Sequence, residues 1–194
     1  LRDEFQTARP HRFEKRIHTI MLAFGGTDQH DLSRKIFHKI KAFCKEQQIF
    51  IQIVTGPGYR GYQALLAEIE KEKGVSLTHA SGVISGVMEE AQLAITSNGR
   101  TVYELAHMNI PSIVIAQHER EITHAFANEK NGFISLGLYS KDNTESAALS
   151  VLSHLILDEG YRYELFQRMT SFRFGKNKRR VVRKIQQLLK VNDE

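Results

Sequence analysis

The sequence contains a single cysteine, Cys44, among its 194 residues. One cysteine cannot form a disulfide within the chain, so we expect a reducing, cytoplasmic setting. A structural zinc site is also unexpected, because thiolate ligands are scarce and the 9 histidines show none of the spacings typical of metal ligands. The sequence therefore predicts no bound metal.

Long apolar runs are absent as well. No segment approaches the roughly 18 residues that span a bilayer, and the N-terminal stretch LRDEFQTARPHRFEKR is polar. We therefore expect no integral membrane segment and no signal peptide. With 41% hydrophobic and 25% charged residues, the composition is typical of a globular protein with a sizeable core. The chain begins with Leu1 rather than methionine, and we expect it to be part of a longer polypeptide.

The formal net charge is +5, and much of the excess lies near the C-terminal end. The basic residues there are Arg173, Lys176, Lys178, Arg179, Arg180, Arg183 and Lys184. Such a cluster is compatible with binding to nucleic acid or anionic lipid. No interleaved aromatic residues or recognised nucleic-acid motif accompany it, so we favour a solvated helix face and expect no nucleic-acid partner.

Apolar runs and helical periodicity alternate six times along the chain. The predicted strands are 17–24, 49–54, 75–78, 93–96, 112–115 and 132–136, and the predicted helices are 32–45, one around 65–69, 83–90, 101–107, 121–129, 144–157, 161–171 and 176–189. Short connections between alternating strands and helices are typical of a parallel sheet covered on both faces. The sequence thus predicts an α/β, Rossmann-like domain with about six strands over residues 17–194, after a lead-in segment of residues 1–16.

In open α/β sheets, ligands bind beyond the carboxyl ends of the strands. The first such loop carries Gly25, Gly26 and Thr27, where the backbone can approach a ligand closely and a hydroxyl can donate to it. A turn from strand to helix also needs glycine for local reasons, so this loop alone does not decide between a site and a turn.

The stretch SNGRTVYE, from Ser97 to Glu104, combines three features. It has a glycine, a helix N-terminus with free N–H groups, and a carboxylate in the first turn. The amides of Gly99 to Thr101 would hold an anion such as a diphosphate, and Glu104 would accept ribose hydroxyls. Thr101 and Glu104 also fit the capping box S/T-x-x-E, which would explain them as helix chemistry alone.

The GGT loop, the TGPGY loop after the second predicted strand and the block NGRTVYELAHMNIPSIVI resemble the C-terminal, nucleotide-binding half of GT-B enzymes. The resemblance is strongest to the UDP-sugar hydrolases of pseudaminic acid biosynthesis and to their spore-coat polysaccharide relatives, and weaker to the peptidoglycan UDP-GlcNAc transferases. It covers roughly residues 17–137, and the opening LRDEF is similar to the segment that joins the two halves in that family.

The resemblance implies a nucleotide-sugar ligand, UDP-linked, and no further cofactor. Its diphosphate would lie on the GGT and NGRT loops, its ribose on Glu104, and its uracil against Gly82, Val83 and Ile84, with Gly56 to Tyr59 beside the base. The ligand-binding residues expected on these grounds are Gly25, Gly26, Thr27, Gly56, Tyr59, Gly82, Val83, Ile84, Asn98, Gly99, Arg100, Thr101, Glu104, Gln117, His118 and Glu119.

The loop after the fifth predicted strand departs from the family. Relatives carry a glutamine or an Asn-Gln pair that touches the sugar, whereas this loop is charged and contains His118, Glu119 and Glu121. Those three residues are candidates for proton transfer, since histidine and paired carboxylates suit acid and base roles. Alternatively, the glutamates stabilise a helix N-terminus and His118 is ordinary surface.

In GT-B enzymes of this kind the catalytic base usually comes from the N-terminal domain, which we expect to lie outside this chain. The resemblance therefore implies the nucleotide-sugar-binding half of a hydrolase or glycosyltransferase in bacterial surface-polysaccharide or nonulosonic acid biosynthesis, with the N-terminal domain as its partner. The alternative is a non-catalytic module that senses a nucleotide sugar and is appended to a cytidylyltransferase-type, sugar-activating enzyme.

Overall fold

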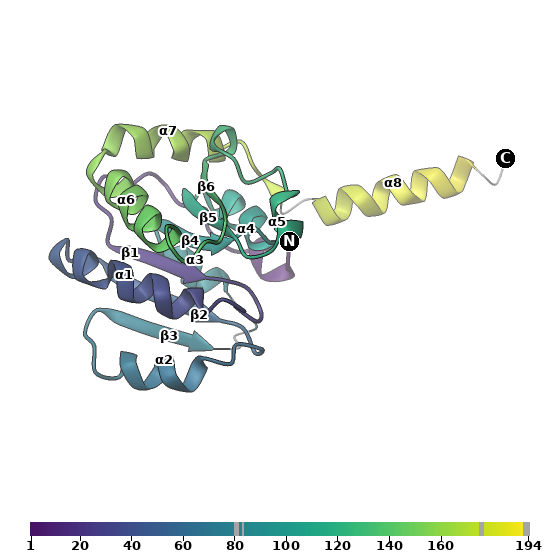
Figure 1. The fold of residues 1–194 in the computed structure, drawn as a ribbon. Coiled ribbons are helices and arrows are strands. Elements are labelled where there is room, and N and C mark those ends of the chain that lie inside the picture. The colour runs from purple at the N-terminus through teal and green to yellow at the C-terminus, as the bar shows by residue number, and fades with distance from the viewer. Residues whose placement is uncertain (80–81, 83, 175–176, 192–194) are drawn as a thin grey trace.

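The structure, a computed structural model, describes residues 1–79, 82, 84–174 and 177–191, with side chains for all of these except 177–179 and 188–191. Six parallel strands form one sheet in the order β3-β2-β1-β4-β5-β6 (Figure 1). The strands are β1 (Thr19–Ala23), β2 (Phe50–Thr55), β3 (Val75–His79), β4 (Leu93–Ser97), β5 (Ser112–Ala116) and β6 (Phe133–Leu138). The predicted Rossmann-like α/β fold is thus confirmed.

Helices cover both faces of the sheet (Figure 1). They are α1 (Leu32–Glu46), α2 (Tyr62–Ile69), α3 (Ser85–Glu90), α4 (Thr101–Met108), α5 (Glu119–Ile122), α6 (Thr144–Leu157), α7 (Glu159–Met169) and α8 (Asn177–Val191), with 3-10 turns at η1 (Asp3–Gln6) and η2 (Glu129–Asn131). The N-terminal turn and the short α5 were not predicted, whereas α6 has the predicted bounds.

Side chains that alternate along β1 enter two separate apolar clusters. Ile20 and Leu22 pack in one cluster with residues of α1 and α6, whereas Met21 and Ala23 pack in the other with residues of α3 and α4. Successive side chains of a strand point to opposite faces, so a fully buried strand feeds both layers. This is why β1 is apolar at almost every position.

The strand order reverses between β1 and β4. The chain moves outward from β1 through β2 to β3, then returns to pair β4 with the other edge of β1. The loop after β1 leads to α1 on one face of the sheet, while the loop after β4 leads to α4 on the other face. The two loops therefore separate at the carboxyl end of the sheet, which is the place where open α/β sheets bind ligands.

The predicted helix over 121–129 is wrong, since α5 ends at Ile122. The Asn98 amide donates to the carbonyl oxygens of Glu121 (2.7 Å) and His124 (3.1 Å), and the Asn128 amide donates to the carbonyl of Ala125 (2.7 Å). Backbone acceptors that a longer helix would use are thus bonded to asparagine side chains. Side-chain competition of this kind favours turns over helix.

Residues 1–16 pack against the sheet domain. Phe5 is only 1% exposed and lies in the apolar cluster of α3 and α4. The backbone N–H of His11 donates to the Met108 carbonyl at 2.9 Å, and the buried guanidinium of Arg162 donates to the Lys15 carbonyl at 2.5 Å. The predicted lead-in therefore packs against the domain and places Phe5 in its core.

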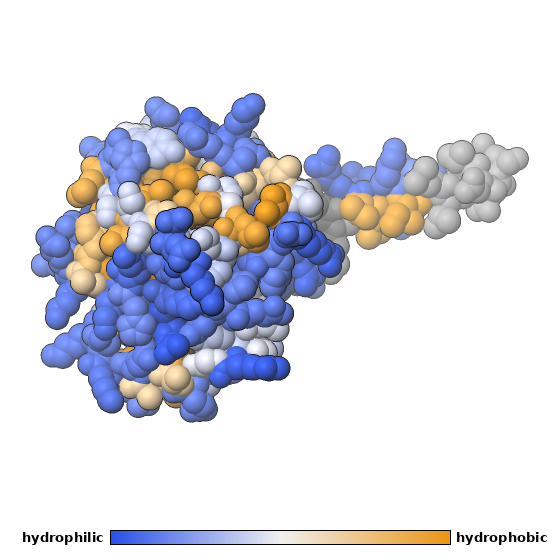
Figure 2. Space-filling view, in the orientation of Figure 1, coloured by the Kyte–Doolittle hydropathy of each residue, from blue (hydrophilic) through white to orange (hydrophobic). Residues whose placement is uncertain are grey.

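Helix α8 extends away from the rest of the chain (Figure 1). Every described side chain from residue 180 to residue 187 is exposed, and Val181, Val182 and Ile185 form the apolar stripe visible on it in Figure 2. The basic residues Arg180, Arg183 and Lys184 occupy the same stretch. None of the described helices is long and apolar enough to cross a membrane.

Truncation after Phe174 is expected to shift the midpoint of thermal unfolding by no more than about 2 °C, because the described side chains of α8 bury little surface. Calorimetry of the two chains measures this. A longer truncation that also removes α7 is the control, and it is expected to abolish the cooperative transition, since Leu165 and Met169 are fully buried. A fall of about 5 °C or more on removing α8 alone would contradict its exposed placement.

Candidate functional site

The loops after β1 and β4 converge on one side chain. A Cβ atom placed on Gly25 would lie 3.7 Å from Ser97 Oγ, and one placed on Gly99 would lie 3.9 Å from the same oxygen. Gly25 has φ +80°, a conformation that favours glycine, and Gly25, Gly26 and Thr27 are exposed. The structure thus brings the two predicted diphosphate loops together at the point where the strand order reverses.

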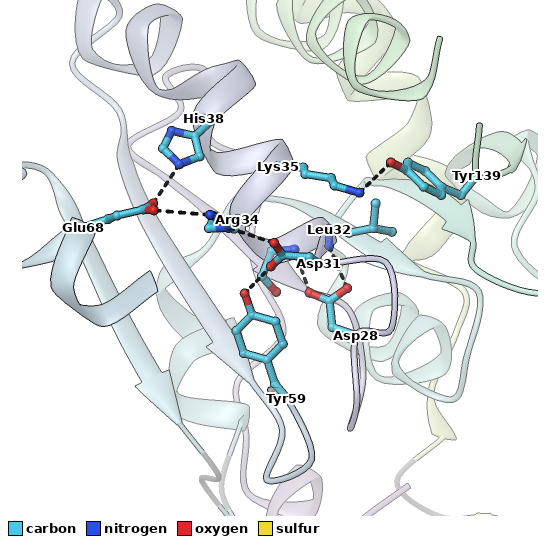
Figure 3. A network of polar contacts seen from close by, with 10 residues as sticks. Asp28, Asp31, Leu32, Arg34, Lys35, His38, Tyr59, Glu68 and Tyr139 are labelled. Carbon is cyan, nitrogen blue, oxygen red and sulfur yellow. Dashed lines mark hydrogen bonds and ion pairs between the residues drawn. The ribbon is translucent and has the colours of Figure 1, made fainter. Parts of the chain in front are cut away.

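The N-terminus of α1 is already capped from within the GGT loop. The carboxylate of Asp28 accepts from the amides of Leu32 (2.8 Å) and Ser33 (2.7 Å), as Figure 3 shows in part. Burial raises the pKa of Asp28, and the hydrogen bonds from Ser33 and Leu32 act against that rise. Because Asp28 occupies these amides, the contribution of this loop to a ligand must come from Gly25 to Thr27.

The N-terminus of α4 is different. Arg100 at the N-cap makes no side-chain capping bond, and within the described residues no side chain accepts from the first-turn amides. Glu104 does not turn back toward Thr101, so the capping box is not formed and that interpretation of the Thr101 and Glu104 pair is wrong. Val102 N and Tyr103 N donate to the carbonyl oxygens of Gly99 (3.4 Å) and Arg100 (3.1 Å). Within the described residues, the N–H groups left without a partner are therefore those of Gly99 to Thr101, at the positive end of the helix dipole.

Glu104 is bound by a residue that the sequence did not suggest. Arg2 Nε and Nη2 donate to the two oxygens of Glu104, each at 2.9 Å, and the Glu104 side chain is only 8% exposed. Arg2 also lies 3.3 Å from Glu4. The bond to Glu104 raises the pKa of Arg2 further. A bidentate fork fixes the orientation of a carboxylate, so Glu104 is held rigidly beside the α4 terminus.

The TGPGY loop supports the GGT loop through backbone contacts. Gly58 N donates to the Gly26 carbonyl at 3.0 Å, and a Cβ on Gly56 would lie 2.4 Å from Gly26 Cα. Tyr59 is 5% exposed and its hydroxyl donates to Asp31 at 2.5 Å (Figure 3). The Tyr59 side chain thus points toward the start of α1 and not outward. If this residue lies beside the base of a nucleotide, as expected, only its backbone would contact that base.

The residues expected around uracil are only partly described. Gly82 is exposed and Ile84 is 6% exposed, while Val83 lies outside the described residues. Just beyond them, Ser85 donates from its amide (3.2 Å) and its hydroxyl (3.1 Å) to Glu4. The N-terminal segment therefore borders both the start of α3 and Glu104.

The loop after β5 is tied to the other two loops. The side-chain Nε2 of Gln117 donates to the Phe24 carbonyl at 2.8 Å, and its main-chain N–H donates to the Glu121 carboxylate at 2.8 Å. His118 and Glu119 are exposed. Glu121 therefore holds the loop in shape and does not form a free pair with Glu119. Among the described residues, no three His, Cys, Asp or Glu side chains are placed to hold a metal ion.

Two buried amide oxygens lie in this region without a hydrogen-bond partner in the described chain, Asn98 Oδ1 and Gln117 Oε1. Their orientation is fixed because the amide nitrogen of each donates to backbone carbonyl oxygens. Buried acceptors left unbonded are uncommon. Both belong to residues that were expected to bind a ligand.

No model of a known protein family matches the chain. The chain is 24% identical over 176 residues to the spore coat polysaccharide biosynthesis protein SpsG of Bacillus subtilis (strain 168), covering 89% of this chain and 47% of that protein. It matches the crystal structure of Acinetobacter baumannii MurG with a TM-score of 0.66 at 14% identity, covering 94% of this chain and 55% of that one. The chain thus spans about half the length of these relatives.

A third match is the pneumococcal O-GlcNAc transferase GtfA in complex with UDP and GlcNAc. Its TM-score is 0.60 at 14% identity, and the match covers 94% of this chain and 38% of that one. At these identities the structural matches establish the fold. The chain has the fold of one half of a GT-B glycosyltransferase, as the sequence motifs predicted.

Proposed function

We propose that the chain is the nucleotide-sugar-binding half of an enzyme that acts on a UDP-sugar, as a hydrolase or a glycosyltransferase, in the synthesis of a surface polysaccharide. The observation that carries this proposal is the convergence of Gly25 and Gly99 on Ser97 at the reversal of strand order. Two glycine loops and one uncapped helix N-terminus meet there, and each provides main-chain N–H groups for an anion.

The proposed nucleoside diphosphate would lie across these loops in one direction. Its diphosphate would lie between Gly25 to Thr27 and Gly99 to Thr101, where backbone donors and the α4 dipole stabilise negative charge. Its ribose would lie on Glu104, whose oxygens keep acceptor capacity after they bind Arg2, because each oxygen has a second lone pair. Its base would lie toward Ile84, near the start of α3.

The contribution of this half to catalysis would be to bind and orient the donor. Main-chain donors aimed at the diphosphate stabilise the charge that develops as the sugar leaves. The base that activates water or an acceptor hydroxyl would come from a second domain of the same polypeptide. Two of the similar proteins support the assignment, since one is a spore coat polysaccharide biosynthesis protein and the structure of the other is a complex with UDP and GlcNAc.

Calorimetry with UDP tests the proposal. The chain is expected to bind UDP, and Glu104→Ala is expected to weaken binding by about 1 to 3 kcal/mol through lost bonds to the ribose hydroxyls. Glu164→Ala is the matched control, because this carboxylate lies on α7 with 64% of its side chain exposed and is expected to leave the affinity unchanged. Absence of binding by any nucleoside diphosphate would refute the proposed function.

A further inference from the structure

Two histidines from different loops meet beside the end of β5. His30 belongs to the loop between β1 and α1, and His118 directly precedes α5. Their ring centroids are 5.9 Å apart, and the His30 ring also lies 4.9 Å from the ring of Tyr139. His30 Nε2 is 3.0 Å from the Gln117 carbonyl oxygen. The pair is brought together by tertiary structure, since 87 residues separate His30 from Gln117.

The hydrogen bond to Gln117 determines which ring nitrogen of His30 carries a proton. A carbonyl oxygen only accepts, so Nε2 must carry the proton and donate it. Nδ1 is then the nitrogen that gains a proton when the ring becomes cationic, and within the described chain it has no hydrogen-bond partner. His118 is exposed, and within the described chain its ring likewise makes no hydrogen bond. Together the two rings can offer two further N–H donors and positive charge to an anion.

The two histidines lie on the α1 side of the proposed nucleotide site, opposite Glu104. Glu104 belongs to α4, on one face of the sheet, whereas His30 leads into α1, on the other face. The Phe24 carbonyl, which immediately precedes Gly25, is bonded to Gln117. A nucleotide with its ribose on Glu104 and its phosphates crossing Gly25 and Gly99 would therefore extend its last phosphate toward the two histidines.

We propose that His30 and His118 form a binding site for the terminal phosphate of the bound nucleoside diphosphate. This proposal rests on the proposed function and deepens it. Imidazolium N–H groups that donate to phosphate oxygens form charge-assisted hydrogen bonds, which are stronger than neutral ones.

The charged groups around the pair are mostly engaged elsewhere. From α1, Lys35 donates to the Tyr139 hydroxyl at 2.9 Å, and that hydroxyl donates to Glu145 of α6 at 3.0 Å. In the loop of His30 itself, the carboxylate of Asp28 caps α1 and that of Asp31 binds Arg34 and Tyr59 (Figure 3).

On the α5 side the neighbours are Glu119, Arg120 and Glu121. The carboxylate of Glu121 accepts from the Gln117 amide, while Glu119 and Arg120 are exposed and opposite in charge. These surroundings leave the two imidazoles as the groups best placed to meet a phosphate at this end of the site.

Calorimetry with UDP and UMP tests the pair, because UMP ends at the phosphate next to the ribose. His30→Gln and His118→Gln are each expected to weaken UDP binding about tenfold and to leave UMP binding within about twofold. Glutamine at position 30 keeps an N–H donor for Gln117. Comparing each variant with the unaltered chain at the same pH cancels the titration of UDP itself.

His154→Gln is the matched control, because His154 lies on α6 with 57% of its side chain exposed and is expected to change neither affinity. Equal losses for UDP and UMP, or no loss for UDP, would overturn the histidine site while leaving the proposed function standing. Absence of UDP and UMP binding to the unaltered chain would instead overturn both.

Discussion

A Gly56→Val variant is expected to lose at least about 3 kcal/mol of unfolding free energy and to lose measurable UDP binding with it. The Cβ atom would lie 2.4 Å from Gly26 Cα, 2.6 Å from Gly26 O and 2.8 Å from Gly26 C. All three are main-chain atoms, which cannot rotate away as a side chain would. The GGT loop must therefore move, and this loop is where the diphosphate is proposed to bind.

Urea unfolding and UDP calorimetry measure the two effects on the same protein. Gly86→Ala is the control, because nothing lies within 4 Å of a Cβ at that position in α3. It is expected to leave UDP binding unchanged and to raise stability by up to about 1 kcal/mol, as alanine is the better helix former. A Gly56→Val protein that is as stable as the unaltered chain would show that the two loops are not in contact.

The fold was largely predictable from the sequence because its strands are buried on both faces. Such strands appear as short apolar runs, and each observed strand lies within two residues of its predicted range. The helix predicted over 121–129 failed for the opposite reason. Its local pattern was helical, but Asn98, which lies 23 residues from Glu121 along the chain, takes the carbonyl oxygens that the helix needed.

The parts of the candidate site that depend on the backbone alone were predictable from the sequence. The glycines and the start of α4 follow directly from strand ends and local chemistry. Contacts between residues far apart in sequence were not predictable in the same way. Arg2 and Glu104 are 102 residues apart, and His30 was one of several histidines with no motif to distinguish it. The LRDEF segment was the available signal for Arg2, but it indicated a connection between domains and not a side-chain contact.

The N-terminal segment therefore links the packing of the domain to its site. Phe5 is buried between Arg2 and His107. The Arg2 guanidinium lies 5.8 Å from the centre of the Phe5 ring, and His107 Nε2 is 3.2 Å from the Phe5 carbonyl oxygen. Burial lowers the pKa of His107, which favours its neutral form beside the Phe5 ring. The packing that buries Phe5 thus also keeps Arg2 beside Glu104.

Phe5→Ala is expected to cost about 4 kcal/mol of unfolding free energy, because it removes a fully buried ring and leaves a cavity. Phe50→Ala is the matched control, since Phe50 is 37% exposed at the start of β2 and should cost about 1 kcal/mol or less. Urea unfolding of the two variants gives both values. Equal small costs would mean that residues 1–16 behave as a detachable linker, whereas a large difference would place Phe5, and with it Arg2, inside the cooperative domain that positions Glu104.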